Sequence, residues 1–324
     1  MKGIRDFLQL MAGCMALSAG AVCAQSFPSR PIQFVVPYPP GGANDIFARY
    51  LGPLMTESMG QNVLVVNQAG AGGTIGTAAV ARAKPDGHTL LLGSSGNLAV
   101  APSLIAKMPY DTLKDLAPVT MLGNVPNILA VHPSIPVNSV KQLVAMAKAE
   151  PGKLAFGSSG IGGSGHLAGE LFNVMAEVKM THVPYKGSGQ SVTALVAGEI
   201  SLTFENMITL MPHAKSGRIR AIAITTPQRS PVVPDLPTIA ESGLPGYVAG
   251  PWFAIMTTGG TPAPVVSVLN RELVKILGRP EVVKFLSDRG TELVTGTPAE
   301  LAAFLRSEIT RWAQVVREAS IKTD

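Results

Sequence analysis

The sequence predicts an α/β protein in which buried strands alternate with helices along most of the chain. Short, nearly continuous apolar runs end in glycine or proline turns, and segments with helical spacing of apolar residues follow them. Hydrophobic residues make up 46% of the 324 residues and charged residues only 15%, which is enough apolar material for one large or two ordinary domains. After residue 262 the pattern becomes mostly helical.

The first predicted strand and helix show the pattern that repeats along the chain. Residues 31–38 form a short apolar run, and residues 45–60 place Phe47, Leu51 and Leu54 at helical spacing. Strands that are apolar on both faces indicate parallel sheets covered by helices. We expect further strands at 62–68, 88–95, 153–159, 180–185, 201–206, 219–226 and 251–258, and further helices at 73–87, 139–152, 165–178 and 189–200.

The last part of the chain indicates how the domains are organised. A Pro- and Gly-rich stretch at 225–247 is followed by one more strand, and helices are then expected at 262–280, 280–290 and 298–320. A helical tail has no sheet of its own, so we expect it to pack on the first α/β unit. Two crossings of the chain, near residues 125 and 250, would then form a hinge with a cleft. The expected lobes are 25–124 plus 250–324 and 125–249, each a mainly parallel sheet flanked by helices.

The N-terminus has the features of a secretory signal peptide. Lys2 and Arg5 precede an apolar stretch at 7–24, and small residues before the end of that stretch predict cleavage after Ala24. A retained membrane anchor is the alternative, although the stretch is short and lacks a basic stop-transfer cluster. A lipoprotein attached at Cys14 is a second alternative. We therefore expect a signal peptide at 1–24 and a soluble, periplasmic mature protein.

Cysteine content and charge exclude several classes of function. Both cysteines, Cys14 and Cys23, lie in the predicted signal peptide, so we expect no disulfide and no thiolate metal site in the mature chain. The formal charge of +5 is spread along the sequence without a block of Lys or Arg. A nucleic-acid partner is therefore not expected.

Glycine-rich loops are the clearest candidates for a functional site. Three of them, at 39–45, 69–76 and 157–166, stand directly before predicted helices, and a fourth, at 92–97, ends a strand. Glycine lets the backbone approach a ligand closely, and a helix N-terminus offers unpaired N–H groups and partial positive charge. Together they predict a site for an anion such as a carboxylate or phosphate. The alternative is that the loops are only turns.

Other motifs point less clearly to chemistry. Residues 160–165 match the glycine pattern of a dinucleotide site, but the strand at 180–185 lacks the acidic residue that would hold a ribose. Phosphate-loop, hydrolase-elbow and zinc-helix motifs are absent from the sequence. We expect no catalytic residue, cofactor or metal. His166 begins a helix beside a glycine loop and is a candidate to line the cleft, whereas Glu205 is either a solvated strand end or a pocket acceptor.

Long motifs of this chain resemble one known family. The segments "FPSRPIQFVVPYPPGGANDIFAR", "AGAGGTIGTAAVARAKPDGHTLLLG", "MPYDTLKDLAPVTMLG", "GSGHLAGELF", "HVPYKGSG" and "DLPTIAESGLPGY" are similar to the Bug-type periplasmic solute-binding proteins, the receptors of tripartite tricarboxylate transporters. The resemblance covers essentially the whole mature chain. It implies a two-lobed periplasmic binding protein of type II-like fold, with a ligand cleft at the hinge that closes on a small carboxylate.

The resemblance also implies which residues contact the ligand. Four positions depart from the pattern of many relatives: Ala43-Asn44 replaces a Gly-Thr or Gly-Ser pair, Glu205 replaces Asp, and Gly163 replaces Thr. The usual ligand can therefore not be transferred to this chain. The implied ligand-binding residues are Tyr38, Pro40, Gly41, Gly42, Ala43, Asp45, Ser94, Ser95, Ser158, Ser159, Gly163, Ser164, His166 and Glu205.

The function that we expect from these residues and from the resemblance is that of a receptor, not an enzyme. A small organic acid would bind by lobe closure, and the closed, monomeric receptor would deliver it to a membrane permease. A periplasmic sensor for a signalling kinase would use the same closed lobes and remains an alternative. An exported enzyme using His166 with Ser164 or Glu205 is a further alternative.

Overall fold

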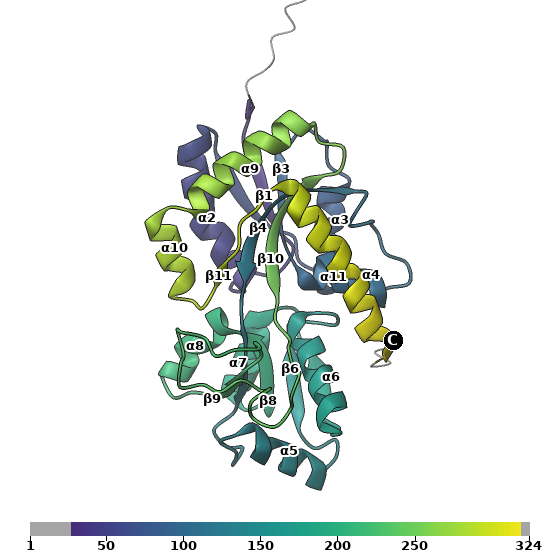
Figure 1. Cartoon of the computed structure of the whole chain (residues 1–324), viewed down its shortest axis with the longest axis vertical. Coiled ribbons are helices and arrows are strands. Elements are labelled where there is room, and N and C mark those ends of the chain that lie inside the picture. Colours follow the sequence, from purple (N-terminus) through teal and green to yellow (C-terminus); the bar gives the residue numbers. More distant parts are fainter. Residues whose placement is uncertain (1–26, 319–324) are drawn as a thin grey trace, which may run out of the picture.

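The computed structural model describes residues 27–318 and shows two lobes, each built on one β-sheet (Figure 1). The signal peptide predicted at residues 1–24 lies outside the described residues. The first lobe has a six-stranded sheet in the order β11-β4-β10-β3-β1-β2, and the second lobe has a five-stranded sheet in the order β7-β6-β8-β5-β9. The predicted α/β class and the two-lobed arrangement are therefore confirmed.

The first lobe contains both ends of the described chain. Its strands are β1 (Ile32–Val36), β2 (Val63–Asn67), β3 (Thr89–Ser94), β4 (Leu116–Asn124), β10 (Trp252–Thr258) and β11 (Glu292–Leu293). Its helices are α2 (Ala43–Met59), η1 (Ala71–Gly73), α3 (Thr74–Ala81), η2 (Gly96–Val100), α4 (Ala101–Leu104), α9 (Ala263–Leu277), α10 (Pro280–Ser287) and α11 (Pro298–Glu318).

The second lobe is formed by the middle of the chain. Its strands are β5 (Asn127–Val131), β6 (Ala155–Ser158), β7 (Thr181–Pro184), β8 (Leu202–Asn206) and β9 (Arg220–Ile224). Its helices are α5 (Val140–Ala149), α6 (Ser164–Ala176), α7 (Ser188–Ala197) and α8 (Met207–Lys215).

The first strand and helix form as their apolar pattern predicts. Phe34 of β1 and Phe47 and Leu51 of α2 lie in one buried cluster, so the apolar face of the helix covers the strand that precedes it. The helix ends at Gly60, whose φ of 68° is the left-handed conformation that commonly terminates helices. This unit fixes where the loop between β1 and α2 leaves the sheet.

The sheets are mixed, whereas the sequence predicts mainly parallel ones. Strands β1, β2 and β3 are parallel, as are β6, β7 and β8, but β10 runs antiparallel to β3 and β4, and β5 runs antiparallel to β8 and β9. The reason is the crossing between lobes. Strand β4 leads out of the first lobe and β10 leads back, so two neighbours that carry the chain in opposite directions pair antiparallel.

Three strands are absent from the predicted set of elements: β4, β5 and the two-residue β11. Strands β4 and β5 come on either side of the first crossing, and their apolar runs are interrupted by Pro118, Gly123 and Pro126. Such residues are typical of turns rather than strand interiors. In the structure Pro118 and Gly123 lie opposite β10 and β11, where the pairing of β4 is irregular or at its end.

The C-terminal helices pack on the first sheet. Helices α9 and α11 both contact β4, and α11 also contacts η2 and α4. Leu269 and Leu273 of α9 join the cluster of Phe34, and Trp312 of α11 joins the cluster on the other side that contains Leu91. In Figure 1, α11 runs along the first lobe towards the junction with the second lobe.

The chain passes between the lobes in two short segments, at 125–126 and 249–251. The amide of Val125 donates to Pro251 O at 2.9 Å, which holds the two crossing segments together. The amides of Asn127 and Ala249 both bond to Thr225, at its Oγ1 (3.1 Å) and its carbonyl (3.0 Å). We refer to these two segments as the hinge segments.

The apolar clusters also connect the lobes. Leu167 of α6 lies in the same buried cluster as Val100 and Leu104 of the first lobe, and Ile208 of α8 joins the cluster around Phe34. The lobes are therefore in contact, as in a closed form of the cleft. Within residues 27–318 no helix combines the length and the apolar character that a bilayer-spanning segment needs.

Candidate ligand-binding site

The first glycine loop connects β1 to α2 and is held from within the first lobe. Asp45, in the first turn of α2, accepts hydrogen bonds from the amide of Gly41 at 3.0 Å, from Arg49 Nε at 3.0 Å and from Asn67 Nδ2 at 2.9 Å. Burial alone would raise the pKa of Asp45, but these three donors together lower it. The carboxylate is thus ionised and fully engaged, so Asp45 fixes the loop around Gly41.

The hydroxyl of Tyr38 lies where this loop meets the end of β3. It is 3.2 Å from Ser94 Oγ and 3.4 Å from Asn97 Oδ1, and Asn97 Nδ2 donates to Thr77 Oγ1 at 2.7 Å. Tyr110 donates to the carbonyl of Asn97. Burial raises the pKa of Tyr38 to about 12, so its hydroxyl keeps its proton at neutral pH. This network joins the first and fourth glycine loops.

The third glycine loop connects β6 to α6 and is held by neutral groups. Ser158 Oγ lies 2.7 Å from His182 Nε2 and accepts the amide of Gly160 at 3.2 Å. The amide of Gly162 donates to His166 Nδ1 at 3.1 Å, and the rings of His166 and His182 stack with their centroids 4.0 Å apart. Burial lowers the pKa of His166 to about 4 and that of His182 to about 3. Both rings are therefore neutral at physiological pH.

Glu205 is the buried carboxyl group of the second lobe. It lies at the end of β8 with no exposed surface, and Ser188 Oγ donates to its Oε2 at 2.7 Å. Oε1 is buried and has no hydrogen-bond partner among the described residues. Burial raises the pKa of Glu205 to about 7, although the nearby backbone amides of Asn206 and Ser159 act in the opposite direction. These amides favour the charge without completing a regular hydrogen bond to Oε1.

Glycines allow the loops of the two lobes to touch. A Cβ atom at Gly72 would lie 2.9 Å from the carbonyl oxygen of Ile161, and one at Gly96 would lie 3.2 Å from that of Gly162. A Cβ at Gly187 would lie 3.0 Å from Cδ of Pro39. These distances are shorter than ordinary carbon–oxygen and carbon–carbon contacts, so larger residues would hold the lobes apart.

Three helices begin at this junction, and their N-termini have no side-chain cap. The N-cap residues of α2, α6 and α7 are Gly42, Gly163 and Gly187, and none of them offers an oxygen to the first-turn amides. Helix α5, elsewhere in the second lobe, is capped by Ser139 in the usual way. The amides of three helix N-termini from both lobes are therefore available to an anion.

A pocket of about 430 Å³ opens at the edge of this junction. It is lined by residues of the first loop and of the start of α7, so both lobes contribute to it. A larger pocket, of about 610 Å³, lies elsewhere, beside the hinge segments, and none of the predicted ligand-binding residues lines it. The smaller pocket is lined by Pro39, Pro40, Tyr185, Gly187, Gly189, Gln190, Thr193, Ala194 and Glu199.

The structure brings most of the predicted ligand-binding residues to the loops that meet between the lobes. Pro40 and Gly41 are exposed, Ser159 and Ser164 are partly buried, and Gly42, Ala43, Ser94 and Ser95 are buried. Asp45, Ser158 and His166 use their side chains to hold their own loops. A Cβ at Gly163 would lie 2.8 Å from Ser159 Oγ, so this loop has little room for the Thr that the family pattern has there.

Two polar residues at the junction are missing from the predicted set. Asn97 bonds to both Ser94 and Tyr38, and Ser188 donates to Glu205. Each stands in a glycine-rich stretch before a helix, the same signal that marks the first and third loops. In the part of the chain that the structure describes, no group of three or more His, Cys, Asp or Glu side chains is arranged to hold a metal ion.

Comparison with known families and sequences gives a consistent result. Residues 47–321 match the model of a family described as "Tripartite tricarboxylate transporter family receptor". The chain is 44% identical over 305 residues to "Protein BugT" of Bordetella pertussis (strain Tohama I), a match that covers 94% of each chain. This family is the one that the sequence motifs resemble.

Solved structures with the same fold include proteins with bound carboxylates. The periplasmic binding protein BugD superposes with a TM-score of 0.88 at 33% identity, covering 92% of this chain and all of that one. The R. palustris protein Rpa4515 with adipate gives 0.89 at 37% identity, covering 91% and 99%. MatC from Rhodopseudomonas palustris with bound malate gives 0.85 at 33% identity, covering 90% and 100%.

Proposed function

The chain belongs to the receptor family of tripartite tricarboxylate transporters, and from this membership and the geometry of its loops we propose that it captures a small carboxylate-bearing ligand between its lobes. The cleft would bind the ligand in the open form and enclose it by closure. The similar proteins determined with adipate and with malate support a small organic acid as the ligand class.

One observation carries this proposal: the uncapped N-termini of α2, α6 and α7 meet at one junction beside the buried carboxyl of Glu205. The helix amides favour an anion. Glu205 fits the same ligand when it is protonated, because its O–H can donate to a carboxylate oxygen, and a pKa of about 7 makes the proton available near neutral pH. Hydrogen bonds of this kind, to a charged partner, contribute about 1.5–3 kcal/mol each.

We propose as ligand-binding residues those that the family resemblance names, together with Asn97 and Ser188. Within this set, the side chains of Asp45, Ser158 and His166 act by positioning, because they fix the first and third loops whose backbone would meet the ligand. The amides and hydroxyls that these loops present then lie in place before the ligand arrives, which reduces the entropy lost on binding.

Closure requires two bodies that rotate about the hinge segments. We propose the division 25–124 plus 250–324 and 125–249 for these bodies. It is supported by the separation of the strands into two sheets, with the chain passing between them at 125–126 and 249–251. Each sheet then moves as a unit, and the glycine loops at its edge open or close together.

The partners and the location follow from the same proposal. The closed receptor would deliver its ligand to a membrane permease of the tripartite tricarboxylate type, and it would act as a monomer in the periplasm after cleavage behind Ala24. A sensor that signals to a kinase would use the same closed lobes and differs only in its partner. The enzyme alternative has less support, because His166 bonds to Gly162 rather than to Ser164 or Glu205.

Calorimetric titration with mono-, di- and tricarboxylates and their neutral amides would test the proposal. A carboxylate should bind without turnover, and its affinity should fall above pH 7 as Glu205 ionises. The variant Gly96→Val should weaken binding about tenfold or more, because its side chain meets Gly162 of the other lobe and opposes closure. Gly189→Ala is the matched control, since its Cβ would lie 3.8 Å from Pro40 O, an ordinary contact. Binding of neutral amides alone would contradict the proposal.

A further inference from the structure

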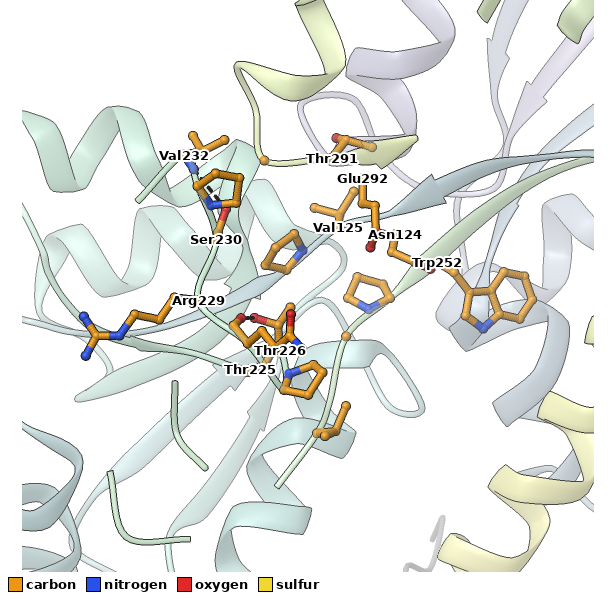
Figure 2. A pocket seen from close by; sticks show the side chains of 18 of the residues that line it. Asn124, Val125, Thr225, Thr226, Arg229, Ser230, Val232, Trp252, Thr291 and Glu292 are labelled. Atoms are coloured by element: carbon orange, nitrogen blue, oxygen red, sulfur yellow. Dashed lines mark hydrogen bonds between the residues drawn. The ribbon is translucent and has the colours of Figure 1, made fainter. Parts of the chain in front are cut away.

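A pocket of about 610 Å³ lies beside the hinge segments, and its walls come from both lobes (Figure 2). Val125, Pro126 and Pro251 of the hinge segments line it. One wall is the loop that follows β9 and includes Val232. The facing wall belongs to the first lobe and includes Phe304 of α11 and the residues just before β11. We refer to it as the hinge pocket.

The hinge segments separate this pocket from the glycine loops. In the first sheet the loops follow β1 and β3, on one side of the crossing strands β4 and β10, whereas β11 lies on the other side. In the second sheet the loops follow β6 and β7, and β9 with its following loop forms the opposite edge beyond β5. The glycine loops and the hinge pocket therefore lie on opposite sides of the same hinge.

When two bodies rotate about a hinge, the space on one side of the hinge widens while the space on the other side narrows. The glycine loops are in contact here, so the cleft side is closed while the hinge pocket is open. A rigid rotation about the hinge segments that separates the glycine loops moves the loop after β9 towards β11 and α11. The hinge pocket then narrows, so its full volume belongs to the closed form.

Several polar groups of the hinge pocket are paired within the protein, whereas Thr291 Oγ1 is buried without a hydrogen-bond partner among the described residues. Glu308 accepts hydrogen bonds from Trp252 Nε1 at 2.7 Å and from Arg311 at 3.1 Å, Arg229 pairs with Glu241, and Thr226 Oγ1 donates to Gln228 O at 2.6 Å. Valine, proline and aromatic side chains supply much of the remaining wall. The charged lining residues, Arg229, Arg311, Glu292 and Glu308, are balanced in sign, so the pocket has no net charge that would attract an ion. Pockets of about 300–1,000 Å³ with such walls accommodate small organic molecules.

We propose that the hinge pocket is a second ligand site, which takes an uncharged apolar or aromatic small molecule only while the lobes are closed. Its occupant stabilises the closed form and so raises the affinity of the cleft for the carboxylate, and the carboxylate raises the affinity of the hinge pocket in return. The coupling to the carboxylate rests on the proposed function, whereas the coupling to closure does not.

Filling the pocket with a side chain tests the coupling to closure without any ligand. Val232→Trp places an indole in the pocket, and Val174→Trp, on an exposed position of α6 outside it, is the matched control. Small-angle scattering of the ligand-free protein should give a smaller radius of gyration for Val232→Trp than for the wild type and the control. Carboxylate affinity should increase about threefold or more in the same variant, by the gain in closed population. If Val232→Trp does not unfold cooperatively, Ser230→Phe replaces it.

Free 5-fluoroindole tests the site itself. Its fluorine NMR signal should broaden with the wild type, more so with carboxylate present, and should broaden less with Val232→Trp, in which the pocket is filled. An unchanged radius of gyration in the filled variant, or 5-fluoroindole binding that Val232→Trp leaves intact, overturns the proposal. If no carboxylate binds the wild type, the proposed function fails, and the scattering comparison still decides the role of the hinge pocket.

Discussion

The two glycine loops that face each other across the cleft are held by different chemistry. In the first lobe an ionised carboxylate, Asp45, collects donors from Gly41, Arg49 and Asn67. In the second lobe neutral histidines and a serine hold the loop around Gly160 and Gly162. Glu205, whose pKa burial raises to about 7, also belongs to the second lobe.

This difference indicates which of the two lobes changes its charge with pH. The carboxylate in the first lobe has a lowered pKa and stays charged from mildly acidic to basic conditions, so its loop is constant. Glu205 adds no negative charge to the proposed anion site as long as it is protonated, and His166 and His182 remain neutral until the pH is well below 6. Four substitutions test this contrast.

The largest expected effect is on Glu205. Its pKa of about 7 in the fold exceeds the 4.5 of the free side chain, so between these values the folded protein keeps a proton that the unfolded chain releases. Stability therefore falls as pH rises from 4.5 to 7 and stays low above 7. Glu205→Gln should remove this slope and stabilise the ligand-free protein at pH 8 by up to about 3 kcal/mol.

Urea unfolding of both proteins at pH 5, 6 and 8 measures this effect. The gain of the variant over the wild type should grow with pH across the series. A gain that is equal at all three values would show that Glu205 is already ionised, or already neutral, throughout the range.

The next effect is on the first loop. Asp45→Ala removes three hydrogen bonds and leaves the amide of Gly41 without its acceptor, whereas Asn67 Nδ2 keeps the carbonyl of Tyr38 at 3.1 Å; the fold should be destabilised by about 1–3 kcal/mol. Denaturant unfolding between pH 6 and 8 should give the same loss throughout, because the carboxylate is charged in this range. Asp45→Asn keeps an acceptor oxygen and should lose less. A loss that varies with pH here would break the contrast between the lobes.

A smaller effect is expected for the histidine pair, whose rings keep some contact with water. The pKa values of both histidines are lowered in the fold. Their contribution to the stability of the protein is therefore complete above pH 6.5 and is lost as the pH falls towards 4, because in this range only the unfolded chain takes up the protons. His182→Gln keeps a polar partner for Ser158 and should make the fall in melting temperature shallower. His132→Gln, outside this cluster, is the control, and an equal change in both variants would contradict the assignment.

The smallest effect is expected for Tyr38→Phe. The substitution removes the hydroxyl near Ser94 and Asn97, but these two residues also bond to each other at 3.1 Å. Little is left unpaired, so the loss in thermal stability should be about 1 kcal/mol or less. A loss as large as that of Asp45→Ala would mean that the tyrosine, and not the carboxylate, is the main support of the first loop.

The sequence predicts the alternating strands and helices because the buried face of each element requires apolar residues at a regular spacing along the chain. Strands β4 and β5 are not predicted in this way because Pro118, Gly123 and Pro126 interrupt their apolar pattern. The apolar pattern does not predict the antiparallel direction of β10 either. The direction of a strand depends on how the chain crosses between the lobes and not on the residues of the strand.

For the candidate site, too, the sequence predicts where the loops lie but not how their side chains are oriented. Glycine loops before helices predict which backbone segments meet, and the same signal at 92–97 and 187–189 would have included Asn97 and Ser188. The sequence does not give the direction of a side chain. Asp45 and His166 stand at the right loops, yet the structure turns them to their own backbones. The burial of Glu205 also depends on segments distant in the chain.

The carboxylate of Glu308 accepts hydrogen bonds from Trp252 at 2.7 Å and from Trp312 at 3.1 Å, and these are the two tryptophans of the protein. Trp252 begins the strand that returns from the hinge and lines the hinge pocket. The whole indole fluorescence of the molecule therefore originates at one point beside the hinge. Its wavelength and intensity should report the rotation of the lobes directly, without any label, so that opening and closure can be followed in real time.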